Sequence, residues 1–336
     1  MLKPNFADYI YSYFMKYLPL QRGLSQSTIS SYSRSLTLFF RYCESEKRIS
    51  WEGLTLEKLN KHIIEEFLLW LESVRNNSIS SRNQRLSAIK SLFRYIQTES
   101  VAHTALCRDI ISIPEKKSPK IPPKYLNETE MEILFSMPDI QTHHGRRDLV
   151  LLLVLYDSAA RANEIINLTV GDISFGKTPT VRLVGKGSKT RVVPISSKTA
   201  DLLQGYLREN DFSTITQLVF INRSHRKLTT TGLSYILNKY TELGKQLNPD
   251  MFQMSISPHL LRSSKASHLI QNGANIYYIR DLLGHSSVLT TERYARNNPE
   301  VVRNAVNKAS SDLVGDLEYY DESEKSALLK YLKSLQ

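Results

Sequence analysis

Three short stretches in the last third of the sequence carry side chains that suit phosphate chemistry. They read His259-Leu260-Leu261-Arg262, Leu283-Gly284-His285 and Thr290-Thr291-Glu292-Arg293-Tyr294. The arginine can bind a phosphate through two parallel hydrogen bonds while keeping its charge, and a neutral histidine can donate to a phosphoryl oxygen or accept a proton near neutral pH. Tyr294 supplies a hydroxyl group, and no metal-ligand cluster accompanies the set. These residues therefore predict cleavage of a DNA strand through a tyrosyl-phosphate.

Two further cations lie upstream in the sequence and could complete such a site. Cleavage without a metal needs fixed positive charge on the nonbridging oxygens and an acid for the leaving 5′-oxygen. Arg161 could supply the charge, with Glu164 three residues later, and Lys186, between two glycines, could reach into a cleft as the acid. Each residue also has a simpler interpretation: a surface Arg161–Glu164 ion pair, an exposed hairpin lysine, a core histidine at His285 and, at Tyr294, one of 18 tyrosines. The order and spacing of the whole set favour the catalytic interpretation.

A segment rich in proline and lysine divides the chain. Residues 112–124 contain four prolines and four lysines, and proline favours extended backbone and lacks a donor. We expect an extended basic linker at 112–124, between a helical DNA-binding domain at 1–111 and a catalytic domain with a C-terminal tail helix at 125–336. The linker's basic side chains could lie along a phosphate backbone: Lys116, Lys117, Lys120 and Lys124.

Apolar residues at helical spacing predict a mainly helical chain. Before the linker the clearest helices cover 63–71 and 86–96, the second capped by Ser80 or Ser81, and after it a buried helix covers 149–156. Strands at 180–184 and 190–195, joined by a glycine-containing turn, predict a hairpin. Helices return from about Lys198, and the last lies near 326–335. The predicted fold class is therefore mainly α, with a small antiparallel β-sheet in the catalytic domain.

One predicted helix of the N-terminal domain carries a polar stripe. Its members are spaced four, three and four residues apart and so share a face: Asn83, Ser87, Lys90 and Arg94. Such a face could lie in a DNA groove, or it could be an ordinary solvated surface.

The composition fits an acidic partner and a reducing compartment. A formal net charge of +11 makes a polyanion such as double-stranded DNA a plausible partner. The two cysteines, Cys43 and Cys107, are far apart in the sequence and are expected as buried thiols of a reducing cytosol rather than as a disulfide. The sequence contains no apolar run of the roughly 20 residues that a membrane span needs, and its N-terminus has no pattern of a cleavable signal. We therefore expect a cytoplasmic protein without a membrane partner.

Taken together, five motifs resemble those of the tyrosine recombinases, the phage-integrase and Xer group, across residues 6–295. The motifs occupy 155–165, 184–194, 259–264, 283–287 and 290–294. Two departures are Ala159-Ala160, where the family commonly has glycine and an apolar residue, and Ser263, where a histidine is frequent. Neither removes a catalytic group.

This resemblance implies a two-domain, C-shaped clamp on DNA, with a helical core-binding (SAM-like) domain and no cofactor or ATP. It implies that Arg161, His259, Arg262 and His285 hold the scissile phosphate and that Lys186 protonates the 5′-oxygen. It also implies that Glu164 orients the site and that Tyr294 forms a 3′-phosphotyrosine. Lys189 and Arg191 lie near Lys186 in the sequence, so they are candidates for DNA contact and leave open which cation is the acid.

The function expected from the resemblance is site-specific recombination through a Holliday junction, for integration, excision or transposition of a mobile element. The alternatives are chromosome or plasmid dimer resolution of the Xer type, a relaxase like type IB topoisomerases, and a DNA-binding protein with a decayed active site. The resemblance further implies a homotetramer on DNA and allows a partner recombinase. Residues 300–305 and 327–335 are the segments expected to dock on a neighbouring protomer, the alternative being that they pack on their own domain.

Overall fold

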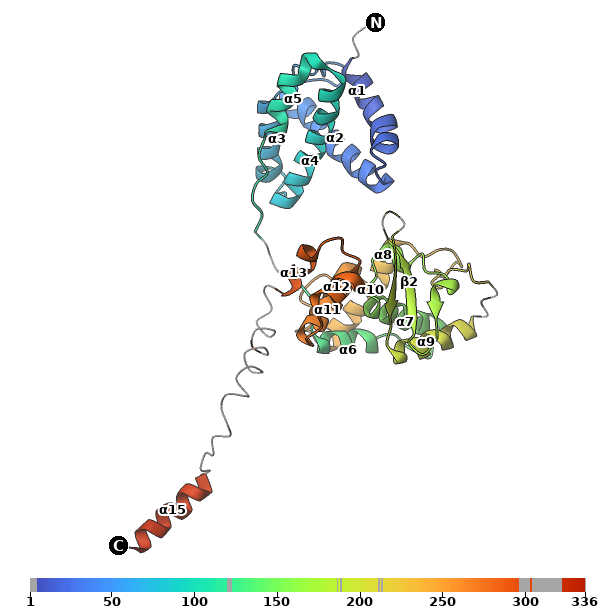
Figure 1. Ribbon diagram of the computed structural model, residues 1–336, viewed down its shortest axis with the longest axis vertical. Helices are drawn as coiled ribbons and strands as arrows, with labels where there is room; N and C mark the ends of the chain where they lie inside the picture. Colours follow the sequence, from blue (N-terminus) through green and yellow to red (C-terminus); the bar gives the residue numbers. More distant parts are fainter. Residues whose placement is uncertain are drawn as a thin grey trace. The chain divides into compact units, whose positions relative to one another are not determined.

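The computed structural model describes residues 5–119, 123–185, 187, 189–210, 212, 214–295, 303 and 322–335 (Figure 1). The chain separates into two compact units, Met1–Lys120 and Ile121–Gln336. The division falls inside the segment expected as a linker. Each unit encloses a hydrophobic core of its own.

Unit 1 is a bundle of helices (Figure 1), and its core is rich in aromatic side chains. Phe39 and Phe67 pack with their ring centroids 5.0 Å apart, and Tyr42 lies 5.3 Å from Phe67. The elements are α1 (Phe6–Ser12), the π-helical segment η1 (Tyr13–Gln21), α2 (Gln26–Lys47), α3 (Lys61–Ser73), α4 (Ile79–Glu99), the 3-10 turn η2 (Val101–His103) and α5 (Thr104–Ile111).

The polar stripe on α4 does not form one exposed face. Lys90 is buried, which lowers the pKa of its ammonium group, and only Arg94 of the four stripe residues is exposed. Asn83 donates from Nδ2 to the Lys116 carbonyl at 2.8 Å and accepts from the Lys116 amide at 3.2 Å. The first residues of the expected linker therefore lie against the start of α4, which the spacing of the stripe could not reveal. The N-cap of α4 is Ser78, whose Oγ accepts from the Ser81 amide at 3.2 Å, so the predicted cap at Ser80 or Ser81 was wrong by two or three residues.

Unit 2 is also mainly helical and contains one small antiparallel sheet, which confirms the predicted fold class. The sheet has the order β1-β2-β3, and Val181 pairs with Val193 in the predicted hairpin. Its first strand, only two residues long, was not predicted. The strands are β1 (Ile173–Ser174), β2 (Thr180–Val184) and β3 (Thr190–Pro194).

The helices of unit 2 place most of the predicted catalytic residues at or near helix ends. Asn127 caps α6, since its side chain accepts from the Glu130 amide while Glu130 accepts from the Asn127 amide. The helical elements are α6 (Glu128–Ser136), α7 (His143–Asp157), α8 (Ala162–Ile165), η3 (Val170–Asp172), α9 (Ser197–Glu209), α10 (Thr230–Leu247), α11 (Pro258–Gln271), α12 (Ile276–Leu283), α13 (Val288–Ala295) and α15 (Glu322–Ser334).

Three further expectations concern the C-terminal segments, the two cysteines and membrane-spanning helices. The leucines of α15 are exposed, for example Leu329 by 59% and Leu332 by 51%, whereas residues 300–305 lie outside the described residues apart from Arg303. Cys43 and Cys107 are both buried free thiols, and burial raises their pKa values to about 12 and about 11. Among the helices of the described ranges, none combines the length and the apolar character needed to cross a bilayer.

Candidate active site

Glu164 is the centre of a buried network that holds two arginines. Arg161 caps the short helix α8, and Glu164, at its third position, accepts from the Arg161 amide at 2.7 Å and from Arg161 Nη1 at 2.9 Å. Arg191, on β3, donates to both carboxylate oxygens at 2.8 Å. The Glu164 side chain is only 2% exposed. The Arg161–Glu164 pair therefore exists, but its carboxylate is buried rather than at the surface.

Each arginine of this network also donates to a carbonyl at the C-terminal end of α12. Arg191 Nε donates to the Leu282 carbonyl at 2.8 Å, and Arg161 Nη2 donates to the Gly284 carbonyl at 3.4 Å. Burial raises the pKa of Glu164, but the hydrogen bonds and charges of Arg191 and Arg161 outweigh it, so the carboxyl pKa lies below its ordinary value. Glu164 is therefore ionised at neutral pH and orients both guanidinium groups.

Arg262 is almost completely buried beside these groups. It is 1% exposed, its Nη1 donates to the Ala159 carbonyl at 2.8 Å and its Nη2 donates to the Leu283 carbonyl. Burial and repulsion from Arg161 and Arg191 lower the pKa of Arg262 to about 10, so it keeps its charge at pH 7. Two guanidinium groups thus bind the Glu164 carboxylate, and a third lies close enough for its pKa to respond to the charges of all three groups. The surplus positive charge, held partly out of water, favours binding of an anion such as a phosphate.

The backbone before Arg161 adopts a conformation that glycine accommodates best. Ala159 has φ +46°, in the left-handed region where a side chain costs on the order of 1 kcal/mol. This gives a physical reason for the glycine that the resembling family commonly has here. In this chain the Ala159 carbonyl accepts a hydrogen bond from Arg262, and the Ala159 methyl group packs in a small cluster with Tyr294.

His259 and His285 lie among the arginines and stay neutral near pH 7. Burial, followed by the charges of Arg262, Arg161 and Arg191, lowers the pKa of His285 to about 4. Burial and Arg262 also lower the pKa of His259. His285 Nδ1 is 2.9 Å from Thr291 Oγ1, so a Thr291 hydroxyl that donates to Nδ1 leaves the Nε2 hydrogen free to donate elsewhere. The histidines can therefore serve as neutral hydrogen-bond partners of a phosphate.

Tyr294 is buried on α13 of unit 2. Its side chain is 5% exposed and packs in the cluster that also contains Ala159, Ala266, Ile279 and Leu283. It is nevertheless close enough to Arg262 to influence the pKa of that guanidinium group. Tyr294 and Arg262 are therefore neighbours, although 32 residues separate them in the sequence.

A hollow of about 1190 Å³ lies in unit 1, and another of about 640 Å³ lies in unit 2 beside the arginines. The second is lined by Arg161, Gly185, Lys189, Thr190, Arg191, Gly284, His285, Ser286 and Thr290. A Cβ at Gly185 would lie 3.1 Å from Glu164 Oε1, and Gly284, at φ +61°, would bring a Cβ within 3.1 Å of Arg191 Cδ. The two glycines thus let the β2–β3 turn and the loop after α12 close on the network.

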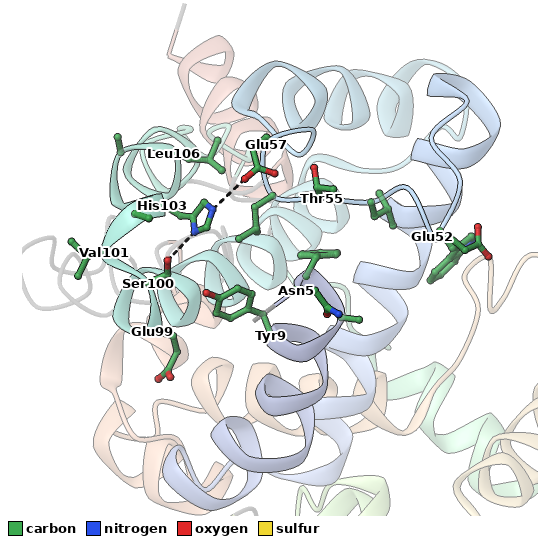
Figure 2. Close-up of a pocket in the computed structure, with 17 residues that line it drawn as sticks. Asn5, Tyr9, Glu52, Thr55, Glu57, Glu99, Ser100, Val101, His103 and Leu106 are labelled. Carbon is green, nitrogen blue, oxygen red and sulfur yellow. Dashed lines mark hydrogen bonds and ion pairs between the residues drawn. The ribbon is translucent and has the colours of Figure 1, made fainter. Parts of the chain in front are cut away.

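The first hollow contains none of the predicted site residues. Figure 2 shows His103 between Ser100 and Glu57, with Nδ1 2.8 Å from Ser100 Oγ and Nε2 3.3 Å from Glu57 Oε1. Glu52 and Glu99 also line it, so its charge is unsuited to phosphate. Within the described residues, no group of three or more histidine, cysteine, aspartate or glutamate side chains is placed to hold a metal ion.

The structure brings together Arg161, Glu164, Arg262, His259, His285 and Tyr294, but it leaves other predicted residues elsewhere or undescribed. Lys186 and Lys120 lie outside the described residues. Lys117, Lys124 and Lys189 are exposed, whereas Lys116 is paired with Glu72 at 2.8 Å. Two contacts escaped the sequence interpretation: the Arg191–Glu164 pair and the Thr291–His285 contact. Only the position of Thr291 inside a motif could have indicated the latter.

The low pKa of His285 predicts an acid-sensitive fold. An unfolded histidine titrates near ~6.5, and the folded pKa is about 4. Between these values the unfolded chain takes up the proton and the folded chain does not, so the free energy of unfolding should fall as the pH falls from ~6.5 towards 4. Denaturant titrations at several pH values would measure the slope. His285→Gln should flatten it, whereas His62→Gln, at a side chain 78% exposed, should not; an equal slope in all three proteins would contradict the prediction.

Comparison with known proteins gives consistent matches across both units. Residues 124–300 match the phage integrase family, and residues 12–100 match the phage integrase N-terminal SAM-like domain. The protein y4rC of Sinorhizobium fredii, whose name marks it as a suspected integrase/recombinase, is 32% identical over 86% of this chain and 87% of its own length. Tyrosine recombinase XerC of Leptospira interrogans is 29% identical over 88% of this chain and 91% of its own.

Solved structures share the fold at lower identity. XerH site-specific recombinase, in a post-cleavage complex with palindromic difH substrate, superposes with a TM-score of 0.68 at 23% identity, over 86% of this chain and 82% of that one. The Tn1549 transposon integrase in complex with transposon right-end DNA superposes with a TM-score of 0.64 at 13% identity, over 90% of this chain and 99% of that one.

Proposed function

Because the chain belongs to the phage integrase family and is a tyrosine-type site-specific recombinase, which breaks and rejoins DNA, we propose that it integrates, excises or transposes a mobile element. Xer-type dimer resolution is the second candidate, favoured by the 29% identity to a XerC protein.

The observation that supports the chemistry is the charge imbalance around Glu164. Arg161 and Arg191 pair with this carboxylate, and the buried Arg262 lies close enough to both arginines and to Tyr294 for its pKa to respond to them.

In the proposed reaction, Arg161 and Arg262 hold the nonbridging oxygens of the scissile phosphate. Tyr294 gives its phenolic proton to a neutral histidine of the site as its oxygen attacks phosphorus, so an O–P bond to Tyr294 forms while the bond to the 5′-oxygen breaks. His259 and His285 bind the phosphoryl oxygens as neutral partners, and Lys186 gives the 5′-oxygen its proton. The phosphodiester energy is kept in the 3′-phosphotyrosine, so a 5′-hydroxyl can reverse the step without ATP. Glu164 orients Arg161 for this work.

We propose that the two domains form a C-shaped clamp on double-stranded DNA in the cytoplasm. Arg94 and the exposed linker and hairpin lysines are its most accessible phosphate contacts, namely Lys117, Lys124 and Lys189. The proposed phosphate contacts also include Lys116, Lys120, Asn83, Ser87, Lys90 and Arg191. Lys90 is buried, and Asn83, Lys116 and Arg191 bind other groups of the chain, so these four would have to rearrange to reach a phosphate. Phosphate contacts of this kind should make the affinity fall steeply with salt.

The exposed leucines of α15 support assembly as a homotetramer on DNA through the C-terminal segment, with exchange through a Holliday junction. Deleting residues after Asp321 should weaken tetramer formation on DNA while leaving the binding of one protomer intact. Unchanged tetramer formation, measured by native mass or light scattering, would rule this segment out.

The biological role is tested by sequencing the DNA that becomes covalently attached to the protein in its host cell. Ends that map to the borders of one mobile element support the proposal. Ends that all map to a single chromosomal or plasmid site would instead establish dimer resolution. Catalytic relaxation of a supercoiled plasmid that lacks the recovered site would favour a relaxase.

Lys186→Ala should slow DNA cleavage by on the order of 10²- to 10⁴-fold without weakening DNA binding, because a general acid contributes about this much. A substrate with a 5′-thio leaving group needs no acid, so it should restore the rate of the variant. The same substitution at Lys189 is the control for the neighbouring cation. If the thio substrate rescues Lys189→Ala and not Lys186→Ala, the acid is Lys189.

A further inference from the structure

Three side chains on one side of α11 hold the end of α7 and the turn that leads from it into Arg161. Arg262, Lys265 and His268 follow each other at intervals of three residues, so they lie on neighbouring turns of the helix. Their partners run in the reverse order. Arg262 Nη1 donates to the Ala159 carbonyl at 2.8 Å, Lys265 Nζ lies 3.0 Å from Asp157 Oδ1, and His268 Nδ1 lies 2.7 Å from the Tyr156 hydroxyl. The helix and the turn are thus paired at three successive points.

The hydrogen bonds of His268 have a fixed direction. Its Nε2 is 2.8 Å from the Leu126 carbonyl, which can only accept, so Nε2 carries the hydrogen. Nδ1 is then an acceptor, and the Tyr156 hydroxyl donates to it. Burial lowers the pKa of His268 and raises the pKa of Tyr156 to about 12, which keeps both groups neutral and this arrangement intact.

His268 has no role in the proposed reaction. Its ring is buried, with 4% of the residue exposed. It does not line the hollow beside the arginines, and an apolar side chain would fill a buried site without the cost of desolvating two nitrogens. A histidine adds two directional hydrogen bonds. Both can form only when α11 is placed at one position along the end of α7. Lys265 supports the same register, with its ammonium 4.6 Å from the centre of the Tyr156 ring.

We propose that His268 is a positioning residue that sets the register between α11, which carries His259 and Arg262, and the turn that presents Arg161. The proposal rests on the proposed function, since it takes Arg161 and Arg262 to hold the same phosphate. Those two arginines come from segments about a hundred residues apart, and a misplacement of ~1 Å can slow a reaction about 10²-fold. The Tyr156–His268 bond limits such a shift from the far end of the helix.

The test removes this bond from each side in the full-length protein. The DNA is a nicked duplex carrying the site recovered by sequencing the trapped ends, and the readouts are the single-turnover rate of covalent trapping and, separately, the affinity. Tyr156→Phe and His268→Leu should each lower the rate by about 10- to 100-fold and change the affinity less than about threefold. Because the two changes remove one shared bond, the double variant should be no slower than the slower single variant. Multiplying defects would overturn the proposal.

A matched control distinguishes a shift of α11 from a general loss of stability as the cause of slower trapping. Tyr206 donates its hydroxyl to the Val219 carbonyl at 3.1 Å in the same unit, so Tyr206→Phe also removes one buried hydrogen bond. It should lower the melting temperature like Tyr156→Phe but leave the trapping rate unchanged. If both variants slow trapping equally, the effect of Tyr156 is general destabilisation and the proposal fails.

Two conservative variants distinguish which hydrogen bond of His268 affects the trapping rate. His268→Asn keeps an acceptor near the position of Nδ1, whereas His268→Gln keeps a donor near the position of Nε2. The proposal requires that Asn restores the rate to within about threefold of the wild type and that Gln does not. The opposite result would assign the effect to the Leu126 contact and overturn the proposal. These variants and Tyr156→Phe carry the test even if His268→Leu does not fold.

An uncharged substrate links the defect to the arginines. Replacing one nonbridging oxygen of the scissile phosphate by a methyl group removes the negative charge that the guanidinium groups hold. On this substrate the defect of Tyr156→Phe should shrink to less than about threefold, and an undiminished defect would contradict the proposal. A failure of the proposed function can be told apart from a failure of this proposal. In that case the protein with an intact His268 would trap DNA even when Tyr294 is replaced.

Discussion

Tyr294→Phe is expected to abolish covalent trapping of DNA, lowering it by on the order of 10⁴-fold or more, as the loss of a nucleophile does in other enzymes. The variant lacks only the oxygen that would bond to phosphorus. The ring should still fill its place beside Ala159, Ala266 and Leu283, since those contacts are apolar. DNA affinity and thermal stability should therefore stay close to those of the wild type.

The experiment uses a nicked duplex from which the strand end diffuses away after cleavage, so that a covalent complex accumulates and is separated by denaturing electrophoresis. Tyr278→Phe is the control, because this tyrosine lies on α12 and is 75% exposed. It should trap DNA at the wild-type rate. Trapping by Tyr294→Phe would show that another residue is the nucleophile.

Glu164→Gln is expected to damage both stability and catalysis. The carboxylate accepts hydrogen bonds from Arg161 and Arg191 on both oxygens, and a glutamine would turn an amino group towards a guanidinium group. Removing one partner of a buried ion pair costs about 3–5 kcal/mol. Because both arginines would lose their orientation, the cleavage rate should also fall by about 10².

The stability loss should depend on pH in a defined direction. The folded pKa of Glu164 lies below its ordinary value, so its stabilising contribution is complete above the unfolded pKa of ~4.3 and is lost as the pH falls towards the folded pKa. The difference in unfolding free energy between the wild type and Glu164→Gln should accordingly shrink below pH ~4.3.

Glu209→Gln is the matched control for this substitution. Glu209 also pairs with an arginine, Arg146, at 2.9 Å, but its side chain is 44% exposed. Such a surface pair contributes at most about 1 kcal/mol, and its loss should not alter cleavage. Denaturant unfolding and single-turnover cleavage measure both variants, and equal effects at the two positions would show that the burial of Glu164 is not decisive.

The sequence by itself determined the family, the main helices, the β2–β3 hairpin and the set of candidate catalytic residues. These features depend on short-range properties of the chain. Apolar spacing, a capping side chain such as Asn127 and a glycine-containing turn act within a few residues of themselves. The five motifs added order along the chain, and the family matches bear out the resemblance drawn from them.

Only the tertiary structure decided how those residues are held. Arg191 was assigned to DNA contact from its place in the sequence, yet it pairs with Glu164, 27 residues away. Lys90 was expected on a polar face, but it is buried on the side of α4 that the expected linker touches. His268 carried no signal at all, and its partners lie 112 and 142 residues away. Such contacts depend on which surfaces meet when the helices pack, and no local pattern encodes that meeting. The chemistry could therefore be identified from the residues alone, whereas the burial, charge and register that would make it work come from packing between distant segments.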